Sequence, residues 1–223
     1  MLTIILADTE LETMPERMVD DYAIRKIAKK SGKRSGEMLL DSNYMHTAIE
    51  RSFPGESTRR GRPDIVHTFL LTGLESILNR SGNLKILVHT RNDRVISFSP
   101  SVRIPRAYNR FTGLVEDLFR KGKIVSGNET LMSVEDKSLR NLVDSFGEVR
   151  KILLWPKADQ RPLHTVIDSG KDLLCVIGGF AGGDFITDTG FIEEKISIYP
   201  EELTVWTVSG EIIAQYERAL KLV

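Results

Sequence analysis

The sequence predicts an α/β fold with a largely parallel sheet, because short apolar runs typical of buried strands alternate with longer segments of helical periodicity. The chain has 223 residues, of which 41% are hydrophobic and 28% charged, which is enough to bury one full core. It has no internal repeat and no low-complexity tract. We therefore expect one domain over residues 1–223, with a basic, loop-rich segment at about 29–61.

The N-terminal part predicts a strand and two helices joined by exposed loops. A continuous apolar run is typical of a strand buried on both faces, and apolar residues at helical spacing predict a helix. Glycine and polar residues mark the loops, and Ser or Asn is suited to cap a helix. In order, the elements are a strand over 1–7, a helix over 14–30, a basic loop over 29–36, a helix from Ser42 or Asn43 to 51, and a loop over 53–61.

The remaining sequence alternates helices and strands. Pro63 and Pro105 suit first turns of helices, Asp64 complements the positive end of its helix, and the polar residues 91–93 indicate a hairpin turn. The predicted helices cover 63–81, 105–121, 134–146 (a weaker pattern) and about 202–220. The predicted strands cover 84–88, 95–98, 151–155, 173–177 and 194–198.

The charges are sorted along the chain, although 31 Lys and Arg balance 31 Asp and Glu overall. No acidic residue lies between Asp93 and Glu116. The basic residues of that stretch are Arg94, Arg103, Arg106 and Arg110. Planar guanidiniums with aromatic residues between them suit phosphate and base recognition, so we interpret this stretch as an RNA or DNA contact. Residues 184–202 reverse the balance, with six acids and one base. The alternative is that both stretches are ordinary solvated faces.

Arg62 and Asp64 flank Pro63 where a loop meets a helix. A carboxylate two residues from an arginine can hold the guanidinium in a fixed orientation by a charge-assisted bond. The alternative is a capped helix start with an incidental arginine.

A glycine-rich loop at 178–184, GGFAGGD, follows an apolar strand, the position at which α/β proteins bind ligands. Its glycines allow backbone groups to approach a ligand closely. The loop matches neither G-x-G-x-x-G nor a P-loop, and Asp184 closes it where a phosphate would need cations. A cationic ligand such as S-adenosylmethionine fits better than a polyphosphate, and a purely structural turn is the alternative.

The sequence shows no motif for a metal site, a nucleophilic cysteine or a Ser/His/Asp triad. Cys175 is the single cysteine and lies in an apolar run, which predicts a packed core residue and a reducing, cytoplasmic location. The four histidines (His46, His67, His89 and His164) show no metal-ligand spacing, so no metal is expected. The start of the chain reaches Asp8 too soon for a signal peptide or a membrane span, and no membrane association is expected.

Four motifs together resemble a known family. They are RPDIVH at 62–67, VRIPRAYNRFTG at 102–113, IGG at 177–179 and EKISIYP at 194–200. In this order they are similar to the small-subunit ribosomal RNA pseudouridine N(1)-methyltransferases. That family is the nucleolar, essential-for-mitotic-growth branch of the SPOUT, or α/β-knot, superfamily. The resemblance covers about residues 60–220, and its arginine motifs are more specific than its glycine loop.

The resemblance implies a homodimeric SPOUT methyltransferase with a C-terminal trefoil knot and S-adenosyl-L-methionine as cofactor. Its substrate is expected to be small-subunit ribosomal RNA, in ribosome biogenesis. Carried over by position, the RNA contacts are Arg62, Asp64, Arg103, Arg106 and Arg110, with Asp64 and Arg62 as the catalytic pair. The cofactor contacts are Gly178, Gly179, Gly183, Ile196, Ser197, Ile198, Tyr199, Pro200 and Glu201.

The reaction implied by the resemblance is methylation of ring nitrogen N(1) of a pseudouridine. The target nucleotide is unstacked and held by guanidiniums on its flanking phosphates, while the sulfonium methyl group supplies the reactivity. Asp64 is expected to orient Arg62 first and to act as a general base second. Two competing hypotheses are a non-catalytic RNA-binding ribosome-assembly factor and an unrelated nucleotide-binding α/β protein, which the acidic end of the glycine loop disfavours.

Overall fold

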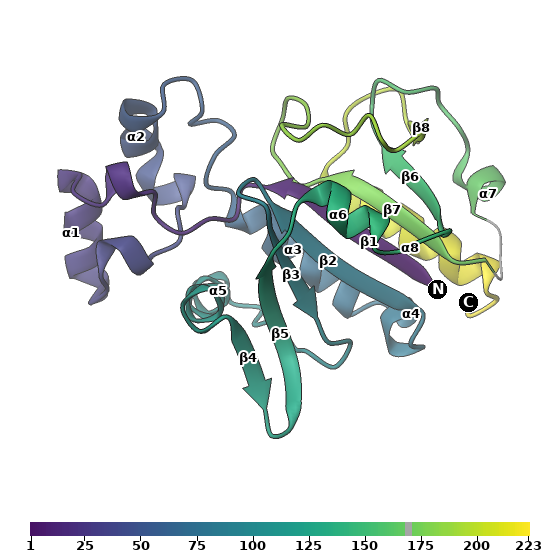
Figure 1. Ribbon diagram of the computed structural model, residues 1–223, viewed down its shortest axis with the longest axis horizontal. Coiled ribbons are helices and arrows are strands. Elements are labelled where there is room, and N and C mark those ends of the chain that lie inside the picture. The colour runs from purple at the N-terminus through teal and green to yellow at the C-terminus, as the bar shows by residue number, and fades with distance from the viewer. Residues whose placement is uncertain (168–170) are drawn as a thin grey trace.

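An eight-stranded mixed sheet runs through the molecule, with helices on both faces (Figure 1). The structure is a computed structural model that describes residues 1–167 and 171–223. The strand order is β4-β5-β3-β2-β1-β7-β6-β8. The strands are β1 (Leu2–Thr9), β2 (Leu84–Thr90), β3 (Arg94–Phe98), β4 (Lys123–Ser126), β5 (Glu129–Asp136), β6 (Arg150–Leu154), β7 (Leu173–Gly178) and β8 (Glu194–Ile196).

The helices are α1 (Tyr22–Ser31), α2 (Ser42–Ser52), α3 (Pro63–Leu74), α4 (Ile77–Arg80), α5 (Tyr108–Lys121), α6 (Leu139–Asp144), α7 (Leu163–Val166) and α8 (Val205–Ala219). Two 3₁₀ turns cover Glu16–Met18 and Ser35–Glu37. None of the described helices is long and apolar enough to cross a membrane.

Five neighbouring strands, β2, β1, β7, β6 and β8, pair in parallel. This confirms the predicted largely parallel sheet, to which β3, β5 and β4 add an antiparallel edge. The carboxyl ends of the parallel strands therefore meet at one edge of the sheet, which is where ligands bind in open α/β folds.

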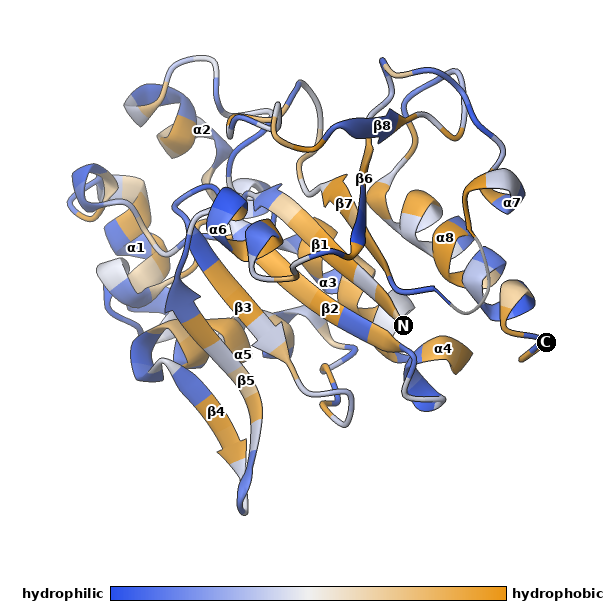
Figure 2. Ribbon diagram, turned by 45° about the vertical axis from the view of Figure 1, so that its right-hand side comes forward, coloured by the Kyte–Doolittle hydropathy of each residue, from blue (hydrophilic) through white to orange (hydrophobic). Residues whose placement is uncertain are grey.

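Strand β1 is buried on both faces, as its continuous apolar run predicts. Leu2, Ile4 and Leu6 belong to a core shared with α3, α5 and α8, whereas Ile5 and Ala7 belong to a second core shared with α6. Figure 2 shows this as hydrophobic colouring along the central strands and on the helix faces turned toward them.

The helix predicted over 134–146 is wrong in its first part. Residues 123–136 form a β-hairpin, β4 and β5, and the helix α6 begins only at Leu139, capped by the Ser138 hydroxyl. The turn contains Gly127 at φ 58°, a conformation that favours glycine. In β5, Met132 is buried between less buried neighbours, an alternation that is typical of a strand. The helical spacing of the apolar residues further along the chain obscured this alternation in the sequence.

Two other predicted helices begin later than expected, and a third is divided in two. The helix predicted from residue 14 starts at Tyr22, because the Asp21 carboxylate caps it by accepting from the backbone N–H groups of Ala23 (2.8 Å) and Ile24 (3.3 Å). The helix predicted over 63–81 is divided at Ser76, whose hydroxyl caps α4. The helix predicted from Pro105 begins three residues later, at Tyr108.

Residues 14–53 form a helical unit with its own apolar core, beside the sheet (Figure 1). Its buried side chains include Met18, Ile24, Met45 and Ile49. The two chain segments that lead into and out of this unit are joined by a buried, two-bond ion pair between Arg60 and Glu12. The basic segment at 29–61 is therefore partly helical, with α2 at its centre.

Candidate functional site

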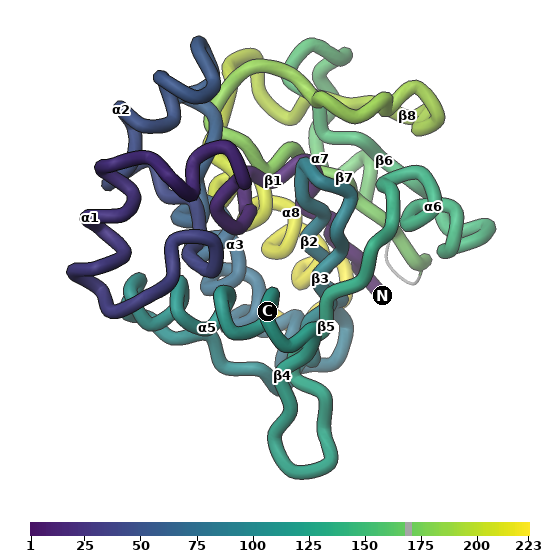
Figure 3. Tube along the Cα trace, turned by 60° about the vertical axis from the view of Figure 1, so that its left-hand side comes forward, coloured from purple at the N-terminus to yellow at the C-terminus, as the bar shows by residue number. Residues whose placement is uncertain are grey.

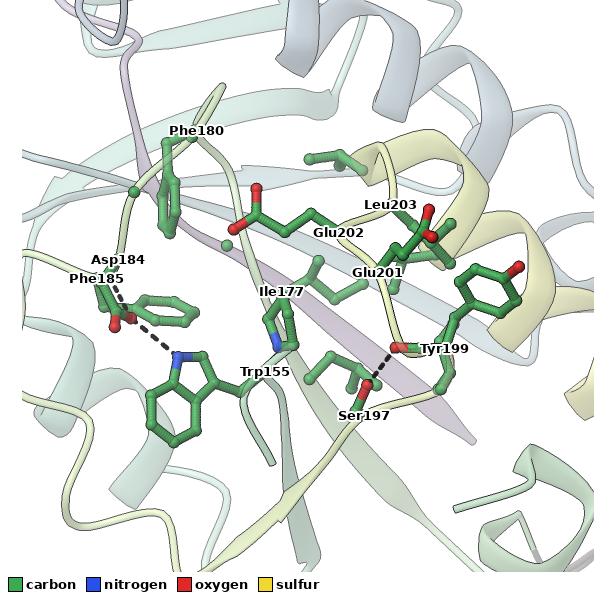
Figure 4. Close-up of a pocket in the computed structure, with 18 of the residues that line it drawn as sticks. Trp155, Ile177, Phe180, Asp184, Phe185, Ser197, Tyr199, Glu201, Glu202 and Leu203 are labelled. Atoms are coloured by element: carbon green, nitrogen blue, oxygen red, sulfur yellow. Dashed lines mark hydrogen bonds between the residues drawn. The ribbon is translucent and has the colours of Figure 1, made fainter. Parts of the chain in front are cut away.

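A pocket opens at the carboxyl ends of β6, β7 and β8 and is closed on its far side by the first turn of α8 (Figure 4). Its walls are formed by three segments that lie far apart in sequence. They are Leu154–Pro156, the glycine loop from Ile177 to Phe185 (with Gly179 not among the lining residues), and 196–208, which contributes Ile196, Ser197, Ile198, Tyr199, Glu201, Glu202, Leu203, Val205 and Val208.

The glycines of the loop are required by close approaches. A Cβ on Gly178 would lie 2.7 Å from the Phe180 ring, and one on Gly179 would overlap Thr9 and lie 3.1 Å from the Ala7 carbonyl. Gly183 adopts φ 86°, which side chains rarely tolerate. The glycines therefore let the loop pack on β1 and leave space in the pocket for a ligand.

The pocket is acidic. Its described lining includes the carboxylates of Asp184, Glu201 and Glu202 and no Lys or Arg. Asp184 accepts from the Trp155 indole N–H (2.9 Å) and from Lys157 Nζ (2.8 Å), and the Lys157 bond is the main cause that lowers its pKa. Apolar walls with several anionic groups suit a cationic ligand with a flat apolar part and disfavour a polyphosphate.

Most of the predicted cofactor residues come together here. Gly178, Gly183 and five residues of the segment 196–201 line the pocket. Gly179 and Pro200 are not among the described residues that line the pocket. The Gly179 N–H instead donates to the Ala7 carbonyl (2.7 Å). Sequence reasoning missed Trp155, although its place at the carboxyl end of a predicted strand was a usable signal.

Asp8 anchors the far end of the glycine loop. It is completely buried at the end of β1, with φ 52°. Its carboxylate accepts from the N–H groups of Ile186 (2.7 Å) and Thr187 (2.9 Å) and from the Thr187 hydroxyl (2.6 Å). A buried carboxylate with three donors holds its partners firmly, so Asp8 fixes the loop beside Phe185.

Arg59 joins the glycine loop to the segment that carries Arg62 and Asp64. Its Nη1 donates to the Asp184 carbonyl (2.6 Å), its Nε donates to buried Glu10 (2.7 Å), and its guanidinium lies 4.2 Å from the centre of the Phe180 ring. Arg59 thus links the pocket to the Arg62–Asp64 motif, because Arg62 follows Arg59 by only three residues.

Arg62 and Asp64 form a two-bond, fork-like pair. Arg62 Nε lies 2.8 Å from one Asp64 oxygen and Nη2 lies 2.7 Å from the other. Both side chains are about one third exposed or less, at 28% and 33%. The hydrogen bond to Asp64 is the largest cause that raises the pKa of Arg62. This geometry is the one predicted for an oriented guanidinium, and an incidental arginine does not explain it.

Two side-chain contacts hold the arginine phrase 102–111 against α3 and the start of α2. His67 Nε2 donates to the Pro105 carbonyl (2.7 Å), and its ring stacks on Phe111 at 4.5 Å. Tyr108 donates to the Asp41 carboxylate (2.6 Å), and burial and this bond raise the pKa of Tyr108. The helix α5 is therefore fixed relative to α2 and α3.

The arginines of the phrase point outward. Val102 and Ile104 are buried, and this alternation leaves Arg103 exposed between them. Arg106 is 82% exposed and lies 3.3 Å from Glu75, while Arg103 and Arg110 have no ion pair among the described residues. Arg94 does not join them: it lies against Phe119 and 3.5 Å from Asp136.

The single cysteine lies outside the pocket. Cys175 is buried, and burial raises the pKa of its thiol to about 12, which confirms a packed core residue. No group of three His, Cys, Asp or Glu side chains among the described residues is arranged to hold a metal ion.

A family model for the EMG1/NEP1 methyltransferases matches residues 4–217, nearly the whole chain. The chain belongs to the EMG1/NEP1 methyltransferase family. The family predicted from the four motifs is thereby confirmed.

Individual EMG1/NEP1 proteins match over their full length. The chain is 52% identical over 222 residues to the ribosomal RNA small subunit methyltransferase Nep1 of Thermoplasma acidophilum, covering 100% of both chains. It is 44% identical to the protein of the same name from Thermococcus onnurineus, covering 97% of this chain and 98% of that one. The crystal structure of Archaeoglobus fulgidus Nep1 bound to S-adenosylhomocysteine matches with a TM-score of 0.86 and 33% identity, over 97% of each chain.

Proposed function

We propose that this chain is an S-adenosylmethionine-dependent methyltransferase that modifies N(1) of a pseudouridine in small-subunit ribosomal RNA, as a step in ribosome biogenesis. The observation that carries the proposal is the combination, in one EMG1/NEP1 chain, of an acidic pocket with an exposed arginine surface, where Arg59 bonds the pocket's glycine loop from the segment that carries Arg62. The names of the relatives, and the S-adenosylhomocysteine bound in the Archaeoglobus structure, support the substrate and the cofactor.

The pocket suits S-adenosylmethionine in shape and charge. Trp155, Phe180 and the apolar start of α8 offer flat apolar walls for the adenine ring, and the backbone beside Gly178 and Gly183 is accessible. The carboxylates of Glu201 and Glu202 suit the ammonium and sulfonium charges. When bound, the cofactor supplies an electrophilic methyl group, so the protein has to supply mainly proximity and alignment.

The arginine surface suits RNA. Arg103, Arg106 and Arg110 are exposed and would neutralise phosphates that flank the target nucleotide. Arg62 would hold the target side of the RNA, with its orientation set by Asp64. Both Asp64 oxygens already accept from Arg62, so we assign Asp64 first as a positioning group and second as the base that takes the N(1) proton.

We further propose a cytoplasmic homodimer built from a single SPOUT domain, with the C-terminal trefoil knot that the resemblance implies. Tyr199 and Trp206, at the rim of the pocket and the start of α8, are 50% and 38% exposed. A second copy of the chain would cover these apolar rings, which supports the dimer.

Incubation of small-subunit ribosomal RNA with the protein and isotopically labelled S-adenosylmethionine tests the proposed function. Mass spectrometry should find one labelled methyl group on a pseudouridine. RNA that is bound but never labelled would instead support the non-catalytic assembly factor.

Each of Arg103, Arg106 and Arg110 should contribute one phosphate contact. Substituting any one with Ala is expected to flatten the plot of log affinity against log salt by roughly one unit, because one fewer counterion is released. The control is Arg140→Ala on α6, which belongs to the other face of the sheet. Unchanged slopes in all three arginine variants would refute this RNA face.

A further inference from the structure

We propose that the basic face of α1 is a second RNA contact, which binds the phosphates of the double-stranded stem next to the target loop. This α1 basic face consists of Arg25, Lys26, Lys29, Lys30, Lys33 and Arg34. The inference rests on the proposed function and names a further part of the same substrate.

The charge of this segment is unbalanced. Residues 25–34 contain six basic residues and no acid, in a chain whose net charge is zero. All six side chains are exposed. Lys26, Lys29 and Lys30 have no ion pair among the described residues, whereas Arg120 and Lys121 on α5 both pair with Asp117. The three lysines therefore present unneutralised charge to solvent.

The helix holds these lysines on one rigid face. Lys26, Lys29 and Lys30 are three and four residues apart, opposite the buried Ile24 and Ala28. The Asp21 cap fixes the start of α1, and Arg51 of α2 bonds the same carboxylate at 2.8 Å.

A helix C-terminus also favours cations, so the last turn alone would explain Lys29 and Lys30. It does not explain Lys26, which lies a full turn earlier, or Lys33 and Arg34, which follow the left-handed Gly32 that ends the helix. The basic face thus extends past the range of the helix dipole at both ends.

The α1 basic face continues the arginine surface. Lys33 pairs with Glu116 of α5, whose other carboxylate oxygen accepts from the Leu39 N–H (3.2 Å). Glu116 lies six residues beyond Arg110, or about 9 Å along the helix. Figure 3 shows α1 and α5 next to each other on the same side of the molecule. An RNA held by Arg110 at its loop can therefore extend across α1.

The chemistry of the face suits a stem rather than a loop. Lysine is a flexible point charge that binds phosphate without reading base edges. The deep, narrow major groove of A-form RNA is closed to side chains, so a stem is recognised mainly through its backbone.

The test compares Lys26→Gln/Lys30→Gln with the wild type on two hairpins that carry the same pseudouridine loop, one with a long stem and one with only the closing base pairs. On the long stem, the log-affinity against log-salt slope should flatten by up to about two units, whereas binding and methylation of the short hairpin stay unchanged. Lys85→Gln/Lys221→Gln, two exposed lysines elsewhere, is the matched control and should behave like the wild type.

A wild-type slope for the Lys26/Lys30 variant on the long stem would overturn this inference and leave the proposed function intact. An equal loss on both hairpins would also overturn it, because the lysines would then contact the loop. If the wild-type protein bound neither hairpin, the proposed function would fail and this inference with it.

Discussion

Asp64→Asn is expected to slow methyl transfer by about a hundredfold while leaving the affinity for S-adenosylmethionine nearly intact. An amide can accept only one of the two bonds that Arg62 now donates, and its NH₂ group would face the guanidinium. The substitution therefore both releases Arg62 and removes a possible base. Single-turnover assays with pseudouridine RNA, and calorimetry with the cofactor, measure the two effects separately.

A double-mutant cycle separates positioning from base catalysis. If Asp64 acts only through Arg62, Asp64→Asn should add almost nothing to the defect of Arg62→Ala. If it takes the N(1) proton, the two defects should multiply. Arg62→Lys keeps the charge but loses the fork, and should also be impaired. Wild-type rates for Asp64→Asn would contradict both roles.

Gly178→Val should reduce the affinity for S-adenosylmethionine at least about a hundredfold, because a branched side chain would push the Phe180 ring into the space that the ligand needs. Even the first carbon of the new side chain would lie 2.7 Å from that ring. Gly182 offers a matched control position, because it also lines the pocket but an added Cβ there would meet no atom within 4 Å.

Gly182→Ala is therefore the control and should bind the cofactor almost as the wild type does. Calorimetry measures both affinities, and thermal unfolding checks that both variants are folded. A folded Gly178→Val protein with unchanged affinity would place the cofactor elsewhere. Tighter binding of ATP than of S-adenosylmethionine by the wild type would favour a nucleotide-binding protein instead.

The sequence was most informative where local chemistry determines geometry. The R-P-D spacing predicted the Arg62–Asp64 bond, because a carboxylate two residues from an arginine, across a proline that restricts the backbone, can hold the guanidinium by a charge-assisted bond. The glycine loop was predicted at the ligand-binding edge because of the apolar strand before it.

Long-range contacts were beyond such reasoning. Asp8 and Arg59 reach the glycine loop from positions 178 and 125 residues away in sequence. Nothing in the local pattern of either residue indicates that partner, and both were overlooked. The β4–β5 hairpin was missed for another reason, because a strand period and a helix period overlap near residue 134 and neither dominates. The trefoil knot and the homodimer stay predictions.

The most direct test of the proposed reaction uses two matched RNA stem-loops that differ only in one nucleotide, pseudouridine or uridine, with labelled S-adenosylmethionine. Pseudouridine is attached to its sugar through carbon, so its N(1) carries a free N–H, whereas the same nitrogen of uridine forms the glycosidic bond. We predict that both RNAs bind through the arginine surface and that only the pseudouridine RNA is labelled. Equal labelling of the two RNAs would contradict the proposed reaction.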